Sequence, residues 1–172
     1  MPNFTLRKEQ TISLRSTERF NSVNFMKITI CGSVASQDKI LSLKGNLEKL
    51  GHEVKIWPLK VKNGEGQLIS VEEYYKIRQT AANDEKWVWD RKAEAIMKHF
   101  NKVARSDAIF VANYDKNDIK GYIGGNTLME IGLAFFLKKK IYLLNQIPEL
   151  PYKEEILGVK PIILYGDLSK IK

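Results

Sequence analysis

The sequence has one cysteine, Cys31, in 172 residues, which excludes an internal disulfide. It has two histidines, and no group of cysteines and histidines shows the spacing of a zinc site. No stretch approaches the ~20 apolar residues of a membrane-spanning helix. Apolar residues make up 44% and charged residues 28%, the balance of a globular protein. We therefore expect a cytoplasmic protein that contacts no membrane and needs no metal or cofactor.

The charge is unbalanced, because 28 Lys and Arg stand against 20 Asp and Glu, giving a net charge of +8. Such an excess favours an anionic partner. The lysines are nevertheless scattered, with one short run at 138–140, and no zinc finger, recognition helix or RNA-binding aromatic motif is present. The sequence thus favours a small anionic ligand over nucleic acid.

The first 25 residues differ from the rest because they show no hydrophobic period. They also lack the apolar core of ~7–15 residues that a secretory signal needs. Met26 directly precedes a strong strand pattern. We expect residues 1–25 to be a loosely ordered extension, or to lie upstream of the true start, and residues 26–172 to form one domain.

From Met26 onward, strand and helix patterns alternate. Apolar runs typical of strands occur at 27–31, 54–57, 108–112, 140–144 and 161–165. Apolar residues at helical spacing occur at 40–50, 96–104 and 127–138. Residues 60–70 hold two glycines and are expected to be a loop. This alternation predicts a parallel sheet with right-handed crossovers. The expected fold class is α/β, a three-layer doubly wound sheet (flavodoxin- or Rossmann-like) of about five parallel strands.

Two of the predicted helices carry further expectations. In the helix at 96–104, the residues Ile96, Met97, Phe100, Val103 and Ala104 fall on one face, which we expect to be buried. The helix at 127–138 is apolar nearly all round, so both of its sides should be covered. One side would contact the sheet and the other a second subunit, which predicts a homodimer or higher homo-oligomer.

Ligands of doubly wound folds bind beyond the carboxyl ends of the strands. The segment 113–132 is the richest there, because its glycines permit close approach of the backbone and a helix begins near residue 126. The free N–H groups of a helix N-terminus favour an anion, although P-loop spacing is absent. The residues expected to bind substrate share these strand-end loops: Gly32, Ser33, Asn113, Gly124, Gly125, Asn126 and Thr127.

Three titratable residues are candidates for catalysis. Thr127 and Glu130 have the spacing of a capping box, in which the glutamate bonds a backbone N–H; alternatively, Glu130 is a carboxylate nucleophile or base at the end of the sheet. Asp115 either contacts a ligand or forms a turn. His99 interrupts an apolar helical face, so it is either a buried structural histidine or an acid that titrates near neutrality.

Four segments together resemble the nucleoside 2-deoxyribosyltransferase superfamily, which includes 2-deoxynucleoside 5-monophosphate N-hydrolases. They are ICGS at 30–33, LEKLGHEV at 47–54, SDAIFV at 106–111 and NTLMEIGLAFFLKKKIYLL at 126–144. The resemblance implies a flavodoxin-like sheet, a homo-oligomer with active sites near subunit interfaces, and a nucleoside or nucleotide substrate. It also implies a glutamate nucleophile that attacks the anomeric carbon of the sugar, and Glu130 matches that residue.

The chain departs from the superfamily pattern at the assisting acids. Active members carry D-x-G-[ST]-x-x-E before the nucleophile, whereas Gly124 stands at the aspartate position and Asn126 at the glycine position. A second family aspartate falls on His99. Either the loop aspartates Asp115 and Asp118 or His99 would then supply the acid.

Two other functions stay open from the sequence. GGNTLME also resembles the PGGxGTxxE motif of phosphoribohydrolases that release cytokinin bases, without the proline. The missing aspartates also fit a nucleotide-binding or sensing module without catalysis. All three alternatives predict a nucleotide-like ligand.

Overall fold

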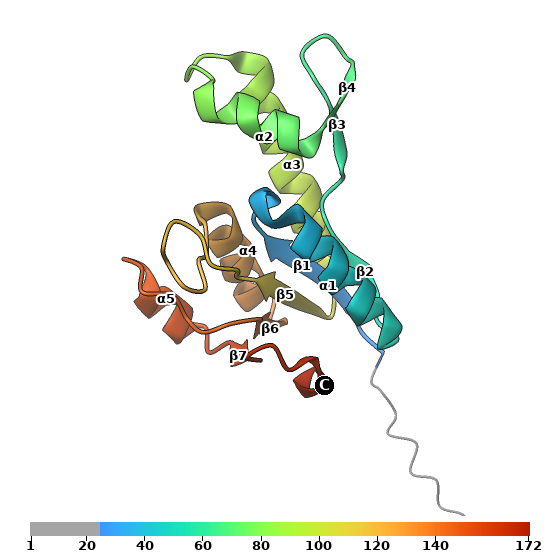
Figure 1. Cartoon of the computed structure of the whole chain (residues 1–172), viewed down its shortest axis with the longest axis vertical. Helices are drawn as coiled ribbons and strands as arrows, with labels where there is room; N and C mark the ends of the chain where they lie inside the picture. Colours follow the sequence, from blue (N-terminus) through green and yellow to red (C-terminus); the bar gives the residue numbers. More distant parts are fainter. Residues whose placement is uncertain (1–24) are drawn as a thin grey trace, which may run out of the picture.

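The structure, a computed structural model, describes residues 25–172 (Figure 1). The expected extension at 1–25 lies outside this part of the chain, apart from its last residue. The main sheet has five strands: β1 (Lys27–Gly32), β2 (Glu53–Lys55), β5 (Ala108–Ala112), β6 (Lys140–Leu143) and β7 (Ile162–Ile163). Their order is β2-β1-β5-β6-β7, and every neighbouring pair is parallel. This is the flavodoxin-like strand order, and the expected fold class is confirmed.

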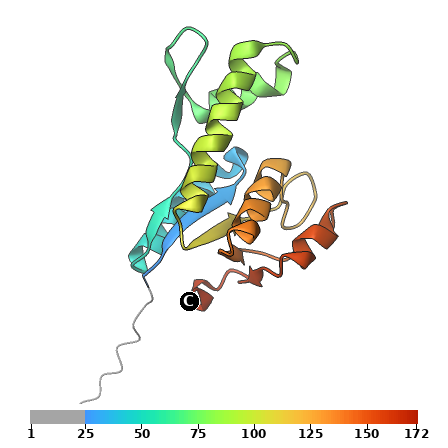
Figure 2. The same cartoon turned by 180° about the vertical axis from the view of Figure 1, so that it is seen from behind.

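Helices cover both faces of this sheet and make three layers (Figures 1 and 2). Helix α1 (Gln37–Lys49) packs on one face with Ile28 and Ile30 of β1. Helices α3 (Lys86–Ala104), α4 (Gly125–Phe136) and α5 (Lys153–Gly158) pack on the other. Because successive side chains of a strand point to opposite faces, Cys31 of β1 belongs to the second layer, with α3 and α4.

The region between β2 and α3 differs from the expectation. Residues 60–70, predicted as a loop, form an antiparallel hairpin of β3 (Lys60–Lys62) and β4 (Leu68–Ser70). Its turn is stabilised by Asn63, whose side-chain oxygen accepts the backbone N–H groups of Glu65 and Gln67. Helix α2 (Val71–Thr80), which the sequence analysis did not predict, follows directly. The hairpin and α2 project beyond the sheet at the end where the short 3-10 helix η1 (Val34–Ser36) lies (Figure 1).

Helix α3 begins ten residues before the predicted helix and turns a different face inward. Its buried residues are Val88, His99 and Val103. Met97, predicted to be buried, is 59% exposed, and Ala104 is exposed as well. The prediction was wrong because apolar spacing was counted over only half of the helix, so that the polar His99 was taken as an interruption of the buried face.

Within residues 25–172, helix α4 is covered on one side only. Ile131 and Ala134 are buried against the sheet, whereas Phe135 is 55% and Phe136 is 80% exposed. The predicted second subunit against this side stays a prediction. Among the described residues, no helix is long and apolar enough to cross a bilayer. The last element is a short 3-10 helix, η2 (Leu168–Lys170).

Candidate functional site

A pocket of about 190 Å³ lies where β1 and β5 end, beneath the projecting helix α2. The chain runs outward from β1 to β2 on one side and to β5 on the other, so this is the switch point in strand order, where doubly wound folds bind ligands. All seven residues predicted to bind substrate line it: Gly32, Ser33, Asn113, Gly124, Gly125, Asn126 and Thr127. Their roles in binding stay predictions.

The pocket is cationic. Arg78 of α2, Lys92 of α3 and Lys116 of the β5–α4 loop line it, and no acidic residue does. Helix α4 also begins there, at Gly125, so its free backbone N–H groups add partial positive charge. Two aromatic rings, those of Tyr75 and Tyr122, complete the lining. The pocket is therefore suited to an anion attached to a group that can contact an aromatic ring.

Several of the lining residues also hold the loops in place. Asn113 is 1% exposed, and its amide group donates to the carbonyl oxygens of Gly121 (3.2 Å) and Gln146 (2.9 Å). Its side-chain oxygen accepts the backbone N–H of Asn145 at 2.9 Å. The Oγ of Ser33 accepts the N–H of Ala35 at 3.3 Å and caps η1. Asn113 thus shapes the pocket through bonds that are already complete.

The β5–α4 loop turns at a glycine that the structure requires. Gly121 has φ of +66°, and a Cβ atom there would lie 2.4 Å from the carbonyl oxygen of Gln146. Asp115, predicted as a catalytic acid, accepts the N–H of Gly121 at 2.8 Å and does not line the pocket. In this structure Asp115 closes the loop, as its alternative turn-forming role predicts.

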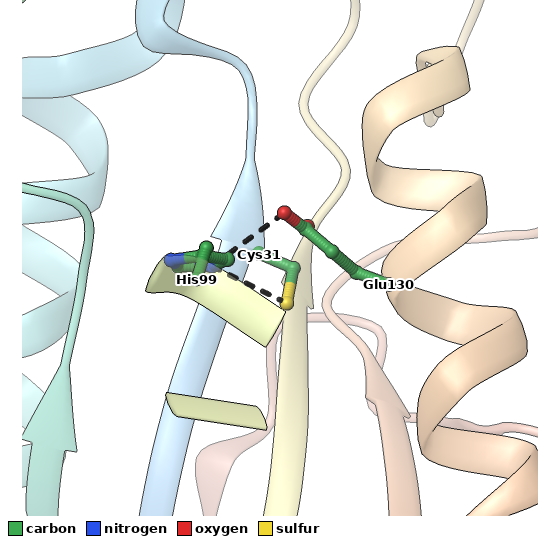
Figure 3. Close-up of side chains that lie close together, drawn as sticks. All are labelled: Cys31, His99 and Glu130. Atoms are coloured by element: carbon green, nitrogen blue, oxygen red, sulfur yellow. Dashed lines mark hydrogen bonds and ion pairs between the residues drawn. The ribbon is translucent and has the colours of Figure 1, made fainter. Parts of the chain in front are cut away.

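Directly beneath the pocket, three buried side chains meet (Figure 3). Cys31 comes from β1, His99 from α3 and Glu130 from α4, and each is at most 6% exposed. The Nε2 atom of His99 lies 3.7 Å from Oε1 of Glu130 and 3.8 Å from Sγ of Cys31. The structure thus brings two of the three catalytic candidates together and adds Cys31. The cluster is assembled from the first strand and two helices, and Cys31 and Glu130 stand 99 positions apart in the sequence.

Glu130 does not cap its helix. Helix α4 begins two residues before Thr127, with Gly124 at the N-cap position and no side-chain cap. Glu130 instead points toward the sheet, and its Oε1 accepts a hydrogen bond from Nδ2 of Asn126 at 3.1 Å. The capping-box interpretation of Thr127 and Glu130 was therefore wrong.

The buried environment changes how Glu130 ionises. Burial raises the pKa of its carboxyl from 4.5 to about 7, and the contacts with Cys31, Lys92 and Asn126 act in the opposite direction. A group with this pKa exchanges its proton near neutrality, which suits a nucleophile or a base.

The other two members of the cluster are neutral at neutral pH. Burial raises the pKa of the Cys31 thiol well above its usual value, and the charge of Glu130 raises it further. Burial and, to a smaller extent, the charge of Lys102 lower the pKa of His99 to about 4, against an opposing contribution from the backbone of Ile30. The imidazole is therefore uncharged, and His99 does not form an ion pair with Glu130 at pH 7.

Asn126 connects the cluster to the pocket. Its side-chain oxygen accepts a hydrogen bond from Nζ of Lys92 at 2.9 Å, while its amide group donates to Glu130. Burial and, to a smaller extent, the charge of Arg78 lower the pKa of Lys92 to about 8, although the charge of Glu130 acts in the opposite direction. Sequence reasoning missed Arg78 and Lys92 because helix α2 and the first half of α3 were not predicted, whereas Lys116 lies within the predicted loop 113–132 and was not singled out there. The only available signal was the charged stretch around Lys92.

Comparisons with known proteins found distant structural similarity and no match in sequence. No protein family profile matches the chain, and no curated protein matches it either. The structure is similar to a 2-deoxyribosyltransferase from the psychrotolerant bacterium Bacillus psychrosaccharolyticus, with 13% identity, 67% of this chain and 69% of that chain covered, and a TM-score of 0.40. It is also similar to the CMP N-glycosidase BcmB of Clostridium botulinum, with 16% identity, 80% and 84% covered, and a TM-score of 0.42.

Proposed function

We propose that this chain cleaves or transfers the N-glycosidic bond of a nucleotide or nucleoside, with Glu130 as the nucleophile. The observation that carries the proposal is the position of a buried carboxyl with a pKa of about 7 next to a cationic pocket at the strand ends. A single side chain, that of Asn126, lies between Glu130 and the pocket and donates a hydrogen bond to Glu130. The match of Glu130 to the superfamily nucleophile, on the segments that carry the sequence resemblance, supports the same assignment.

The reaction has two steps. In the first, the Glu130 carboxylate attacks the anomeric carbon, the bond to the base breaks, and the base leaves with the bonding electrons and takes up a proton. In the second, water or another base attacks the same carbon and releases Glu130. Because Asn126 lies between Glu130 and the pocket, we expect the Asn126 side chain to move when substrate binds.

The proton for the leaving base requires an acid on the pocket side. Lys92 is suited to this role, because it lines the pocket and its pKa of about 8 leaves it protonated but acidic near neutrality. His99, with its pKa of about 4, is a weaker candidate. Asp115 is also a weaker candidate, because it accepts a hydrogen bond from the backbone N–H of Gly121 and does not line the pocket.

The pocket also favours a phosphorylated substrate. Three basic residues and the N-terminus of α4 surround a volume of about 190 Å³, below the ~300–1,000 Å³ of pockets that enclose a whole drug-sized ligand. We infer that the pocket takes the sugar and its 5-phosphate, while the base lies at its mouth against the two tyrosines. A nucleoside should then bind more weakly than its monophosphate.

The test is release of free base from a panel of nucleosides and their 5-monophosphates, followed by chromatography. Glu130→Gln keeps the size and the hydrogen bond from Asn126 but removes the nucleophile, so base release should stop while nucleotide binding remains. Glu94→Gln, an exposed residue of α3, is the matched control and should keep full activity. Full activity of the Glu130 variant would refute the assignment.

A second experiment addresses the phosphate. Charge-assisted hydrogen bonds contribute about 1.5–3 kcal/mol, so removing the lining lysine that has no catalytic role, by Lys116→Met, should weaken monophosphate binding by about tenfold or more. Lys98→Met, with a 63% exposed side chain, removes the same charge outside the pocket. Equal losses in the two variants would contradict a phosphate site at Lys116.

A non-catalytic nucleotide sensor is the second candidate. One observation favours it: Glu130 is 3% exposed and does not itself line the pocket. In that case nucleotides would raise the melting temperature without any release of base. A phosphoribohydrolase would instead release base from ribonucleoside monophosphates, so the same panel distinguishes all three.

A further inference from the structure

The cluster of Cys31, His99 and Glu130 has more polar atoms than hydrogen bonds. The Nδ1 atom of His99 is buried and makes no hydrogen bond of good geometry among the described residues, although the backbone of Ile30 lies close enough to the ring to favour its protonated form. Within the cluster, Nε2 of His99 lies 3.7 Å from Glu130 and 3.8 Å from Cys31. Sγ of Cys31 lies 4.0 Å from the carbonyl oxygen of Thr29, so all three are long contacts. Buried polar groups normally have close partners, and groups without them call for an explanation.

The three donor atoms are also arranged like the ligands of a metal ion. Sγ of Cys31, a ring nitrogen of His99 and a carboxylate oxygen of Glu130 all lie within 4.8 Å of one another. In a tetrahedral zinc site, bond lengths of about 2.0–2.3 Å place such atoms about 3.3–3.6 Å apart. The two separations from His99, 3.7 and 3.8 Å, need to shorten by a few tenths of an ångström, and the separation between the donor atoms of Cys31 and Glu130 is at most 4.8 Å.

The chemistry of the donors selects the kind of ion. Thiolate and imidazole favour zinc-like transition metals over magnesium and calcium, which prefer oxygen. One thiolate and one carboxylate would balance the charge of a divalent ion, so the loaded cluster would be neutral overall, as burial requires. Three protein ligands leave one tetrahedral position for water or another ligand.

We propose that Cys31, His99 and Glu130 bind one divalent transition-metal ion of the zinc type. The sequence analysis predicted no metal site because no cysteines and histidines lie at the short spacing of a zinc motif. Such spacing cannot reveal this cluster, because Cys31 and His99 are 68 positions apart in the sequence. Metal binding itself is independent of the glycosidic activity proposed above. Its consequence rests on that activity: a metal bound to Glu130 occupies the carboxylate that attacks the sugar, so zinc should inhibit base release.

The test is titration of the whole chain with Co²⁺, followed by displacement with Zn²⁺, in the absence of substrate. Because Cys31 is the sole cysteine of the chain, a thiolate-to-cobalt charge-transfer band can come only from this site. We expect that band at one equivalent, with the intense visible absorption of tetrahedral cobalt, and its loss on addition of zinc. Failure of this experiment is separate from failure of base release, since no substrate is present.

Variants assign the other two ligands. His99→Gln and Glu130→Gln should each weaken cobalt binding by at least about tenfold, and Cys31→Ser should abolish the charge-transfer band. His52→Gln is the matched control, because His52 is the other histidine and is also buried. If a variant does not fold, X-ray absorption of the zinc-loaded wild type decides: one sulfur among nitrogen and oxygen ligands supports the site. No band at one equivalent, or a band unchanged in the His99 and Glu130 variants, would overturn it.

Discussion

Replacing Glu130 by glutamine should make the protein more stable at alkaline pH while it removes activity. The pKa of this carboxyl is raised by burial from 4.5 to about 7. Between those values the folded chain keeps a proton that the unfolded chain has lost, so stability falls as pH rises. Glutamine carries no charge, so the Glu130→Gln variant does not lose stability in this way as the pH rises.

The magnitude follows from the pKa difference. Because each pKa step corresponds to 1.36 kcal/mol, the burial of the charge costs about 3 kcal/mol at pH 8 and about 1 kcal/mol at pH 5. The stability of Glu130→Gln relative to wild type should therefore improve by about 2–3 kcal/mol between these two pH values. For a chain of this size that corresponds to roughly 5–10 °C in melting temperature.

The assay is thermal unfolding of both proteins at pH 5 and at pH 8. Taking the difference between the two pH values cancels any pH-independent packing effect of the substitution, and other groups titrate in both proteins. Glu94→Gln is the control, since its hydrogen bond with Lys98 lowers the pKa of Glu94. A carboxyl of lowered pKa is ionised in both the folded and the unfolded chain above pH 5, so the stability of this variant relative to wild type should hardly change between the two pH values. An equal difference between wild type and Glu130→Gln at both pH values would refute the buried, proton-exchanging carboxyl.

Two further predictions use other measurements. The rate of base release should rise about sixfold from pH 6 to a maximum at about pH 7.5, as the ionised fraction of Glu130 grows, and fall above that as Lys92 loses its proton; a rate that is constant over this range would contradict both roles. Gly121→Ala should lower stability by at least about 1 kcal/mol because of its positive φ and its contact with the Gln146 carbonyl. Gly45→Ala, in open space within α1, should instead raise stability by about 0.5–1 kcal/mol. Denaturant unfolding measures both, and equal effects would contradict the close approach at Gly121.

The sheet could be predicted because its strands carry local signals. The run AIFVA is apolar throughout, and it forms β5, whose five residues are all buried. The hairpin and α2 were missed because their signals are polar. Ser70 and Glu73 have capping-box spacing, and Oγ of Ser70 does accept the N–H of Glu73 at 3.0 Å. The same spacing at Thr127 and Glu130 was misleading, because that glutamate lies one turn inside its helix.

The loops that line the candidate pocket could be predicted from the sequence, whereas the helix residues that line it and the buried cluster beneath it could not. The seven predicted pocket residues are close in sequence to strand ends, and the strand-end rule finds such residues without any structure. Lys92 and Arg78 reach the pocket from helices of polar sequence, so no local pattern points to them. The meeting of Cys31 with His99 depends on the rotation of α3, which only the packing of the whole helix determines.

The lone thiol has a practical consequence. Cys31 is fully buried and its pKa is raised, so a thiol-reactive dye should not label the native chain. Every modified molecule would then record one opening of the layer between β1, α3 and α4, and with excess dye the labelling rate would report how often that layer opens. Cys31 is therefore a natural probe of local opening between β1, α3 and α4, and its labelling can be followed by mass spectrometry without an engineered cysteine.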